Sequence, residues 1–180
     1  MNLRKKIVAL SMVFALALGM ATSAFAVDKR STPDGFYQLL PLQNESLGLN
    51  VSHPLGDYSK LNGLAITLYT SEMNEDQLFK LNRGFSLGTL YIYSKILFDP
   101  VNRTGYVLNR DNGDSHCILY SAQAADEDDS HVTVNDGDGS GHAYYQLSDG
   151  DVLVATSLSK NARVYWRSPK WNDNELWIAK

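Results

Sequence analysis

One pattern occurs twice along the chain and constrains its fold more than any other feature. A segment that ends in an aromatic residue is followed by a short polar turn, and then by Gln or Glu, Leu and an aromatic residue. The first copy is Ala65–Tyr69 followed by Asn74–Phe79, and the second is Ala162–Trp166 followed by Asn172–Trp177. Because internal repeats decide the architecture of a whole chain, this recurrence predicts repeated structural units.

Short runs rich in β-branched and aromatic residues fill the chain from residue 35 onward, with turn residues such as Asn62-Gly63 and Asp149-Gly150 between them. No segment shows clear helical periodicity. We therefore predict an all-β domain over residues 35–180, with twelve strands in three pseudo-symmetric four-stranded repeats of about 35–88, 89–141 and 142–180. The expected strands are 35–41, 47–52, 63–70, 77–82, 90–98, 104–109, 116–122, 131–135, 142–148, 151–156, 162–168 and 175–179.

The spacing of the strands sets how the repeats align. The third strands of the repeats end in Tyr69, Tyr120 and Trp166. Twelve positions separate Leu108 from Tyr120, and the same number separates Val154 from Trp166. On this spacing Trp166 is the counterpart of the two tyrosines.

Three repeats of four strands resemble the β-trefoil of the ricin B-type lectin family, whose repeats end in a Gln-x-aromatic motif. Gln77-Leu78-Phe79 matches this motif, and Glu175-Leu176-Trp177 matches it with Glu in place of Gln. The middle repeat departs from it, with Ser130-His131-Val132 at the aligned positions. The resemblance implies a barrel of six strands that is capped by three hairpins.

The resemblance also implies where sugar-binding residues would lie. In the family, each repeat places an acid on its second strand, an aromatic residue at the end of its third strand, and an Asn before the Gln-x-aromatic motif. In the first repeat these positions are Asn50, Tyr69 and Asp76. In the third repeat they are Leu153 or Ala155, then Trp166 and Asn174, and in the second they are Val107, Tyr120 and Asp129.

No repeat keeps the family's full set, but an aromatic platform beside carboxylate or amide groups is what sugar recognition needs. Asn50, Tyr69, Asp76, Trp166 and Asn174 are therefore the predicted carbohydrate-binding residues. Their partner would be a glycan or polysaccharide. Gln77 and Glu175 are expected to support turns, because buried backbone groups need hydrogen-bond partners.

Other interpretations of the same residues stay open. Strand aromatics such as Tyr69 are ordinary in β proteins. A degenerate trefoil could instead bind a protein, as a secreted inhibitor or as a subunit of a toxin or surface complex. Trp171 follows the turn Arg167–Lys170 and is either an exposed anchor for a partner or packed under that turn.

The first 26 residues have the features of a signal peptide. A basic stretch, Arg4–Lys6, precedes the apolar run Ile7–Met20, and Ala24-Phe25-Ala26 supplies small residues for cleavage. We expect a bacterial protein that is exported to the cell envelope or the medium, with a flexible N-terminal segment at 27–34. No later apolar run is long enough to span a membrane.

Composition excludes several functions. The full chain has a net charge of −4, and all charged residues of the signal segment are basic, so the mature chain is more acidic still. An acidic surface without Lys/Arg clusters argues against binding to nucleic acid. Cys117 is the only cysteine, which excludes an intrachain disulfide and suggests a buried thiol.

Signs of catalysis and of metal binding are weak. The sequence has no His-Glu-x-x-His motif, phosphate loop or dinucleotide fingerprint, and we expect neither an enzyme nor a cofactor. A secreted hydrolase is a remaining alternative. Asp136 and Asp138 resemble the start of a calcium loop, but Leu147 stands where the bidentate Glu would be, so an acidic turn is the preferred interpretation.

Overall fold

The computed structural model describes residues 35–52, 60–83, 90–99, 101–102, 104–137 and 139–180. The described residues form twelve strands. The first repeat contains β1 (Leu39–Pro41), β2 (Leu47–Val51), β3 (Leu64–Thr70) and β4 (Phe79–Arg83). The second contains β5 (Leu90–Ser94), β6 (Tyr106–Arg110), β7 (Cys117–Ser121) and β8 (Val132–Asp136). The third contains β9 (Ala143–Leu147), β10 (Val152–Ala155), β11 (Val164–Arg167) and β12 (Trp177–Ala179). The predicted count and grouping are confirmed.

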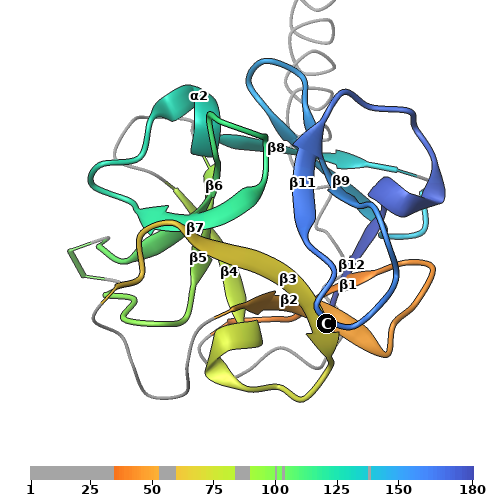
Figure 1. Ribbon diagram of the computed structural model, residues 1–180, viewed down its shortest axis with the longest axis horizontal. Helices are drawn as coiled ribbons and strands as arrows, with labels where there is room; N and C mark the ends of the chain where they lie inside the picture. Colours follow the sequence, from red (N-terminus) through yellow and green to blue (C-terminus); the bar gives the residue numbers. More distant parts are fainter. Residues whose placement is uncertain (1–34, 53–59, 84–89, 100, 103, 138) are drawn as a thin grey trace, which may run out of the picture.

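Six of the strands form a ring. Strand β1 pairs with β12, β12 with β9, β9 with β8, β8 with β5, and β5 with β4. A bridge between Tyr37 and Phe79 returns from β4 to the segment before β1. Figure 1 shows the repeats following one another around a common centre, from orange through green to blue. A closed ring leaves few unpaired strand edges at which another chain could pair with the sheet.

The other six strands form the hairpins β2–β3, β6–β7 and β10–β11. The hairpins also contact one another. Strand β3 pairs with β7, and single bridges join Thr67 to Arg163 and His116 to Tyr165. Each hairpin therefore contacts both others, which fixes the relative positions of the loops and strand ends that line the pockets described below.

Three short helical turns were not predicted. They are η1 (Glu75–Gln77), α2 (Glu127–Ser130) and η2 (Asp173–Glu175), and each precedes the last strand of its repeat. They span only three or four residues, which is too short to produce a helical period in the sequence. In η2 the Asn172 side chain accepts a hydrogen bond from the backbone of Asn174, and Glu175 completes a capping box.

The interior is a single main cluster of apolar side chains from all three repeats, including Leu49, Leu68, Leu108 and Trp177. Cys117 belongs to this cluster and is fully buried. Burial raises the pKa of its thiol far above the ordinary value, which neighbouring Trp166 and the backbone of Asn109 only partly offset. The expectation of a buried thiol agrees with this placement.

The amino-terminal segments 1–26 and 27–34 lie outside the described residues. Within the described part of the chain, no helix is long and apolar enough to cross a membrane.

Candidate functional site

The first pocket lies where β2 and β3 meet the turn before η1, and it brings together all three residues predicted for the first repeat. Its volume is about 290 Å³. Its lining residues are Asn50, Ser52, Thr67, Tyr69, Glu72, Asn74, Asp76 and Asn161. Residues 26 positions apart in the sequence converge here because β2 and β3 pair in antiparallel register and the following turn folds back over the hairpin.

The polar groups of the first pocket are available to a ligand. The Asn50 side chain donates a hydrogen bond of 3.0 Å to the Val51 carbonyl, so its own carbonyl oxygen is left to accept another. Asp76 has no hydrogen-bond or ion-pair partner among the described residues. Tyr69 is half-buried, and the Lys160 ammonium lies 3.9 Å from the centre of its ring. The pocket therefore combines an aromatic ring with an unpaired carboxylate, while Lys160, which does not line the pocket, lies over the ring of Tyr69.

The hairpin registers show which residues are equivalent in the three repeats. Fully buried residues pair across each hairpin: Leu49 with Leu68, Leu108 with Leu119, and Leu153 with Trp166. Trp166 is therefore equivalent to Leu68 and Leu119, not to the tyrosines. In the third repeat, the counterpart of Tyr69 and Tyr120 is the next residue, Arg167.

The prediction that Trp166 offers an aromatic platform is wrong. Its side chain is 0% exposed and belongs to the main apolar cluster. Because side chains alternate between faces along a strand, a shift of one residue moves the ring from the surface into the core. Leu153 and Ala155 are also buried, and Val154 lines the third pocket in the place that Asn50 holds in the first.

Trp166 was matched with Tyr120 because Leu108 and Tyr120 are as far apart in the sequence as Val154 and Trp166. The β6–β7 pairing closes at Arg110–Cys117 and the β10–β11 pairing closes at Ala155–Val164, so the two connections differ in length. The turn that follows is the better guide. Asn74 lies five residues after Tyr69, and Asn172 lies five residues after Arg167, not after Trp166.

The second pocket contains the same kinds of polar residues as the first. The comparison of the repeats in the sequence missed one of them. This pocket has a volume of about 250 Å³ and is lined by Asn109, Arg110, Asp111, Asn112, Ile118, Tyr120, Ala124, Asp126 and Asp129. Asn109, not Val107, is the counterpart of Asn50, and its side chain donates in the same way, to the Arg110 carbonyl at 2.7 Å. The shared dipeptides Leu49-Asn50 and Leu108-Asn109 carried this signal in the sequence.

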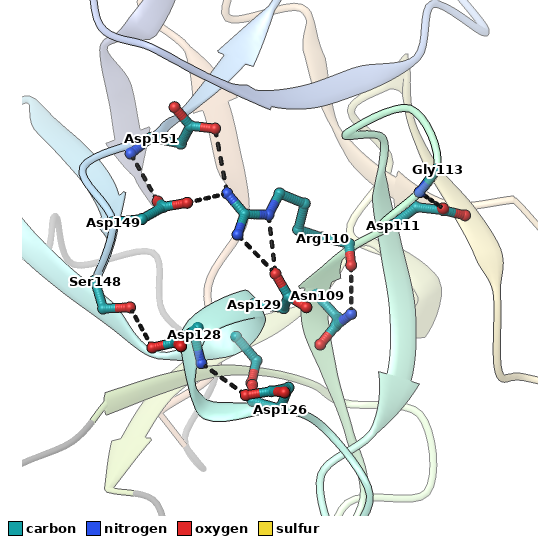
Figure 2. A network of polar contacts seen from close by, with 11 residues as sticks. Asn109, Arg110, Asp111, Gly113, Asp126, Asp128, Asp129, Ser148, Asp149 and Asp151 are labelled. Carbon is teal, nitrogen blue, oxygen red and sulfur yellow. Dashed lines mark hydrogen bonds and ion pairs between the residues drawn. The ribbon is translucent and has the colours of Figure 1, made fainter.

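In the second pocket, Arg110 forms an ion pair with the acid, Asp129. Its guanidinium Nε lies 2.9 Å and its Nη2 lies 2.8 Å from Asp129, and Nη1 contacts Asp149 and Asp151 from the β9–β10 turn. Figure 2 shows the guanidinium between Asp129 on one side and the other two carboxylates on the opposite side. Asp129 is 7% exposed, so its charge serves this network and is not offered to a ligand as that of Asp76 is.

The same network shifts the titration of Asp149. Partial burial disfavours its charged form, but hydrogen bonds from Arg110 and from the Asp151 backbone favour it and lower the pKa of Asp149 below its ordinary value. The cluster therefore joins the second and third repeats through charge-assisted contacts.

Gln77 and Glu175 support the turns, as expected from the sequence. Gln77 accepts from the Glu72 backbone at 2.8 Å and donates to the Thr70 carbonyl at 2.8 Å. Glu175 accepts from the backbone of Lys170 at 2.8 Å. Both side chains are buried, at 1% and 2% exposed. The matching contacts place Glu72 and Lys170 at equivalent positions of their repeats.

The third pocket has a volume of about 620 Å³ and is larger than the other two. It contains Asn174, at the position of Asp76. Its lining residues are Asp114, Ser115, Asp151, Val154, Ala155, Thr156, Trp166, Arg167, Ser168, Lys170, Asn172, Asn174 and Glu175. The predicted pair of Trp166 and Asn174 does lie at one site, but only Asn174 is exposed there.

The nearby Trp171 combines the two alternatives left open for it. Its side chain is 57% exposed, and its ring makes an edge contact with Tyr144 at 5.2 Å between centroids. Met73 holds the same place in the first repeat, and the two share a left-handed backbone, with φ of 57° and 54°. Met73 is 43% exposed. The turns beside the first and third pockets thus each carry an exposed apolar side chain.

Two chemical alternatives involve residues that lie partly or wholly outside the described part of the chain. Among the described residues, no group of three or more His, Cys, Asp or Glu could hold a metal ion; Asp138 lies outside them. The segment Gly84-Phe85-Ser86-Leu87-Gly88 fits the Gly-x-Ser-x-Gly pattern of hydrolases but also lies outside the described residues.

Comparison with solved structures identifies the fold. A designed threefold-symmetric protein, ThreeFoil, superposes with a TM-score of 0.63 at 19% identity, covering 81% of this chain and 98% of that one. The Rhizoctonia solani agglutinin superposes with a TM-score of 0.59 at 16% identity, covering 84% and 98%. The fold is a β-trefoil.

SeviL bound to asialo-GM1 saccharide is a further match, with a TM-score of 0.55 at 13% identity, covering 81% of this chain and 95% of that one. The agglutinin from Abrus precatorius is another similar structure, and two further ones are toxins. No protein-family model matches this sequence, and no curated protein matches it. The trefoil architecture is therefore supported by shape, while the ligand must be argued from the pockets.

Proposed function

We propose that this β-trefoil binds carbohydrate without catalysis, and that its first pocket is a sugar site. The observation that carries the proposal is the convergence of Asn50, Tyr69 and Asp76 in one pocket, where the Asp76 carboxylate has no partner among the described residues. Sugar hydroxyls donate hydrogen bonds to carboxylate and amide oxygens, and the apolar face of a sugar ring packs on an aromatic ring. The similarity of the fold to agglutinins and to a saccharide-bound trefoil supports the same proposal.

The second pocket is proposed to bind sugar weakly or not at all. It has the matching residues Asn109, Tyr120 and Asp129, but Arg110 already neutralises Asp129. A ligand would have to replace a charge-assisted contact that the fold itself uses. This difference provides a matched control for the first pocket.

Asp76→Asn and Tyr69→Ala are each expected to weaken glycan binding about tenfold to a hundredfold. A hydrogen bond to a charged group contributes about 1.5–3 kcal/mol, and each 1.4 kcal/mol is tenfold in affinity. The measurement is calorimetric titration with the best neutral ligand from a glycan array. Tyr120→Ala, the equivalent change in the second pocket, should leave the affinity within about twofold. Equal losses from both tyrosine variants, or an array without any bound glycan, would contradict the proposal.

Protein recognition is a second candidate, favoured by the exposed Met73 and Trp171 at equivalent turns. Partners captured from a mixture of secreted and host proteins distinguish the two functions when capture is repeated with excess free sugar. Loss of capture indicates a lectin that binds glycoproteins, and unchanged capture indicates a protein-binding trefoil.

We also propose that the protein is exported after removal of residues 1–26. The basic, apolar and small-residue segments of the amino terminus support this. Amino-terminal sequencing of protein recovered from outside the cytoplasm should begin at Val27. Recovery of only the uncut chain, in the cytoplasm, would contradict the proposal.

A further inference from the structure

We propose that the third pocket binds an acidic sugar, one that carries a ring-linked carboxylate, while the first pocket binds a neutral one. This inference rests on the proposed function, because it assigns a ligand class to one of the sugar pockets.

At three equivalent positions the third pocket is more positive than the first. The hairpin register places Arg167 where the first pocket has Tyr69. The contacts to Gln77 and Glu175 place Lys170 where the first pocket has Glu72. Asn174 replaces Asp76, so two acids of the first pocket become one cation and one amide, and a second cation replaces the ring.

The acids that line the third pocket already have partners. Asp151 contacts Arg110, at 3.2 Å, and Ser168, at 3.3 Å. Asp114 contacts the His116 ring and accepts a hydrogen bond from the His116 backbone N–H. Glu175 accepts from the backbone N–H groups of Lys170 and Asn172 and is 2% exposed. None of these carboxylates is in contact with the charged groups of Arg167 or Lys170 among the described contacts.

The guanidinium of Arg167 is held in place. It lies 4.3 Å from the centre of the Tyr165 ring, which restrains a flexible side chain over an aromatic face. A planar guanidinium can then donate two parallel hydrogen bonds to a carboxylate, and a nearby lysine adds a point charge. An anion in this pocket would therefore meet two cations, of which one is already oriented.

The remaining lining suits a sugar better than a simple anion. Asn174 and Thr156 can exchange hydrogen bonds with hydroxyl or acetamido groups, and Val154 supplies an apolar surface. The volume of about 620 Å³ accommodates more than one small anion and falls within the range of small-molecule sites. A pyranose with a carboxylate, such as a sialic acid or a uronic acid, satisfies both the charge and the polar groups.

The test compares acidic and neutral oligosaccharides on three proteins: wild type, Arg167→Gln/Lys170→Gln and Tyr69→Ala. The probes are sialyllactose, a glucuronate-containing oligosaccharide and lactose, titrated by calorimetry at 0.15 M salt. We expect wild type to bind at least one acidic probe about tenfold or more tighter than lactose. The double variant should lose this preference and keep its affinity for neutral sugar. Tyr69→Ala should bind the acidic probe with the affinity of wild type. The acidic probe that binds distinguishes a sialic acid from a uronic acid.

A matched control uses Lys60→Gln, which removes an exposed cation that lines none of the three pockets and should change no affinity. Arg167 and Lys170 are both exposed, so the double variant should keep the wild-type melting temperature; if it does not, each single variant is titrated instead. The inference is overturned if the cation variants bind acidic probes as wild type does, or if wild type prefers lactose. Binding of acidic probes alone would overturn the assignment of a neutral sugar to the first pocket and support that of an acidic sugar to the third. Absence of all glycan binding would overturn both assignments.

Discussion

Trp166→Ala will destabilise the fold by about 3–5 kcal/mol, because truncation of a buried tryptophan removes apolar contacts and leaves a cavity. The side chain is fully buried at the contact between the β10–β11 hairpin and the rest of the core. A domain of this size has a total stability of about 5–15 kcal/mol, so the variant should unfold at a much lower denaturant concentration than wild type. Urea denaturation followed by tryptophan fluorescence and circular dichroism measures the change.

Two further variants test whether the loss of stability in Trp166→Ala comes from the burial of its ring. Trp166→Phe keeps a large aromatic ring in the core and leaves a smaller cavity, so it should cost much less than alanine. Tyr69→Ala, at the half-buried strand end of the first repeat, should cost less than about 1 kcal/mol. A Trp166→Ala protein as stable as Tyr69→Ala would contradict the register that places this ring in the core.

Arg110→Val is expected to destabilise the fold by about 2–3 kcal/mol at neutral pH. Removing one partner of a fully buried ion pair costs about 3–5 kcal/mol, and the cost is smaller here because the Asp149 side chain is 42% exposed. The equivalent positions in the other repeats are Val51 and Ala155, so valine fits the position sterically. The loss would arise from the three carboxylates left without their cation. The measurement is again chemical denaturation, at several pH values.

The cost of Arg110→Val should shrink as the pH falls. In wild type the pKa of Asp149 is lowered, so this group contributes stability above its unfolded pKa of about 3.9 and loses that contribution as the pH falls through the lower folded pKa. In the variant the neighbouring carboxylates repel one another, and protonation relieves the repulsion. The stability difference between the two proteins is therefore expected to be largest near pH 7 and smallest near pH 3.

Arg110→Val/Asp129→Asn is the matched control. It gives the second repeat a neutral residue in place of its buried acid, and should recover about half of the lost stability, because the most buried of the three uncompensated charges is gone. A stability difference that does not depend on pH, or a double variant that is less stable than Arg110→Val, would contradict the electrostatic explanation.

Much of the architecture followed from local patterns. Alternating apolar residues, turn dipeptides and the repeated Gln-Leu-Phe and Glu-Leu-Trp segments were sufficient to predict twelve strands in three repeats. Patterns of this kind depend on neighbouring residues, which is why they can be recognised in one chain. The short turns η1, α2 and η2 were missed for the same reason, since three or four residues contain no period.

The candidate sites were predicted in part. Asn50, Tyr69 and Asp76 do line one pocket, and Asn174 lines another. The comparison of the repeats nevertheless chose Trp166 where Arg167 is equivalent, and it overlooked Asn109. Equal spacing in the sequence concealed that the hairpin connections differ in length. In a strand, such a shift by one residue exchanges a surface group for a core group.

The sequence by itself determined the fold class, the repeat number and the chemical character of the first pocket, because each depends on residues that are close together or that recur in a fixed order. Only the tertiary structure decided that Trp166 is a core residue, that Arg110 neutralises Asp129, and that Arg167 and Lys170 face one pocket. Those facts depend on cross-strand register and on contacts between repeats, such as that of Arg110 with Asp149, 39 residues later in the chain. Contacts over such separations are set by how the three hairpins pack, and no local pattern records them.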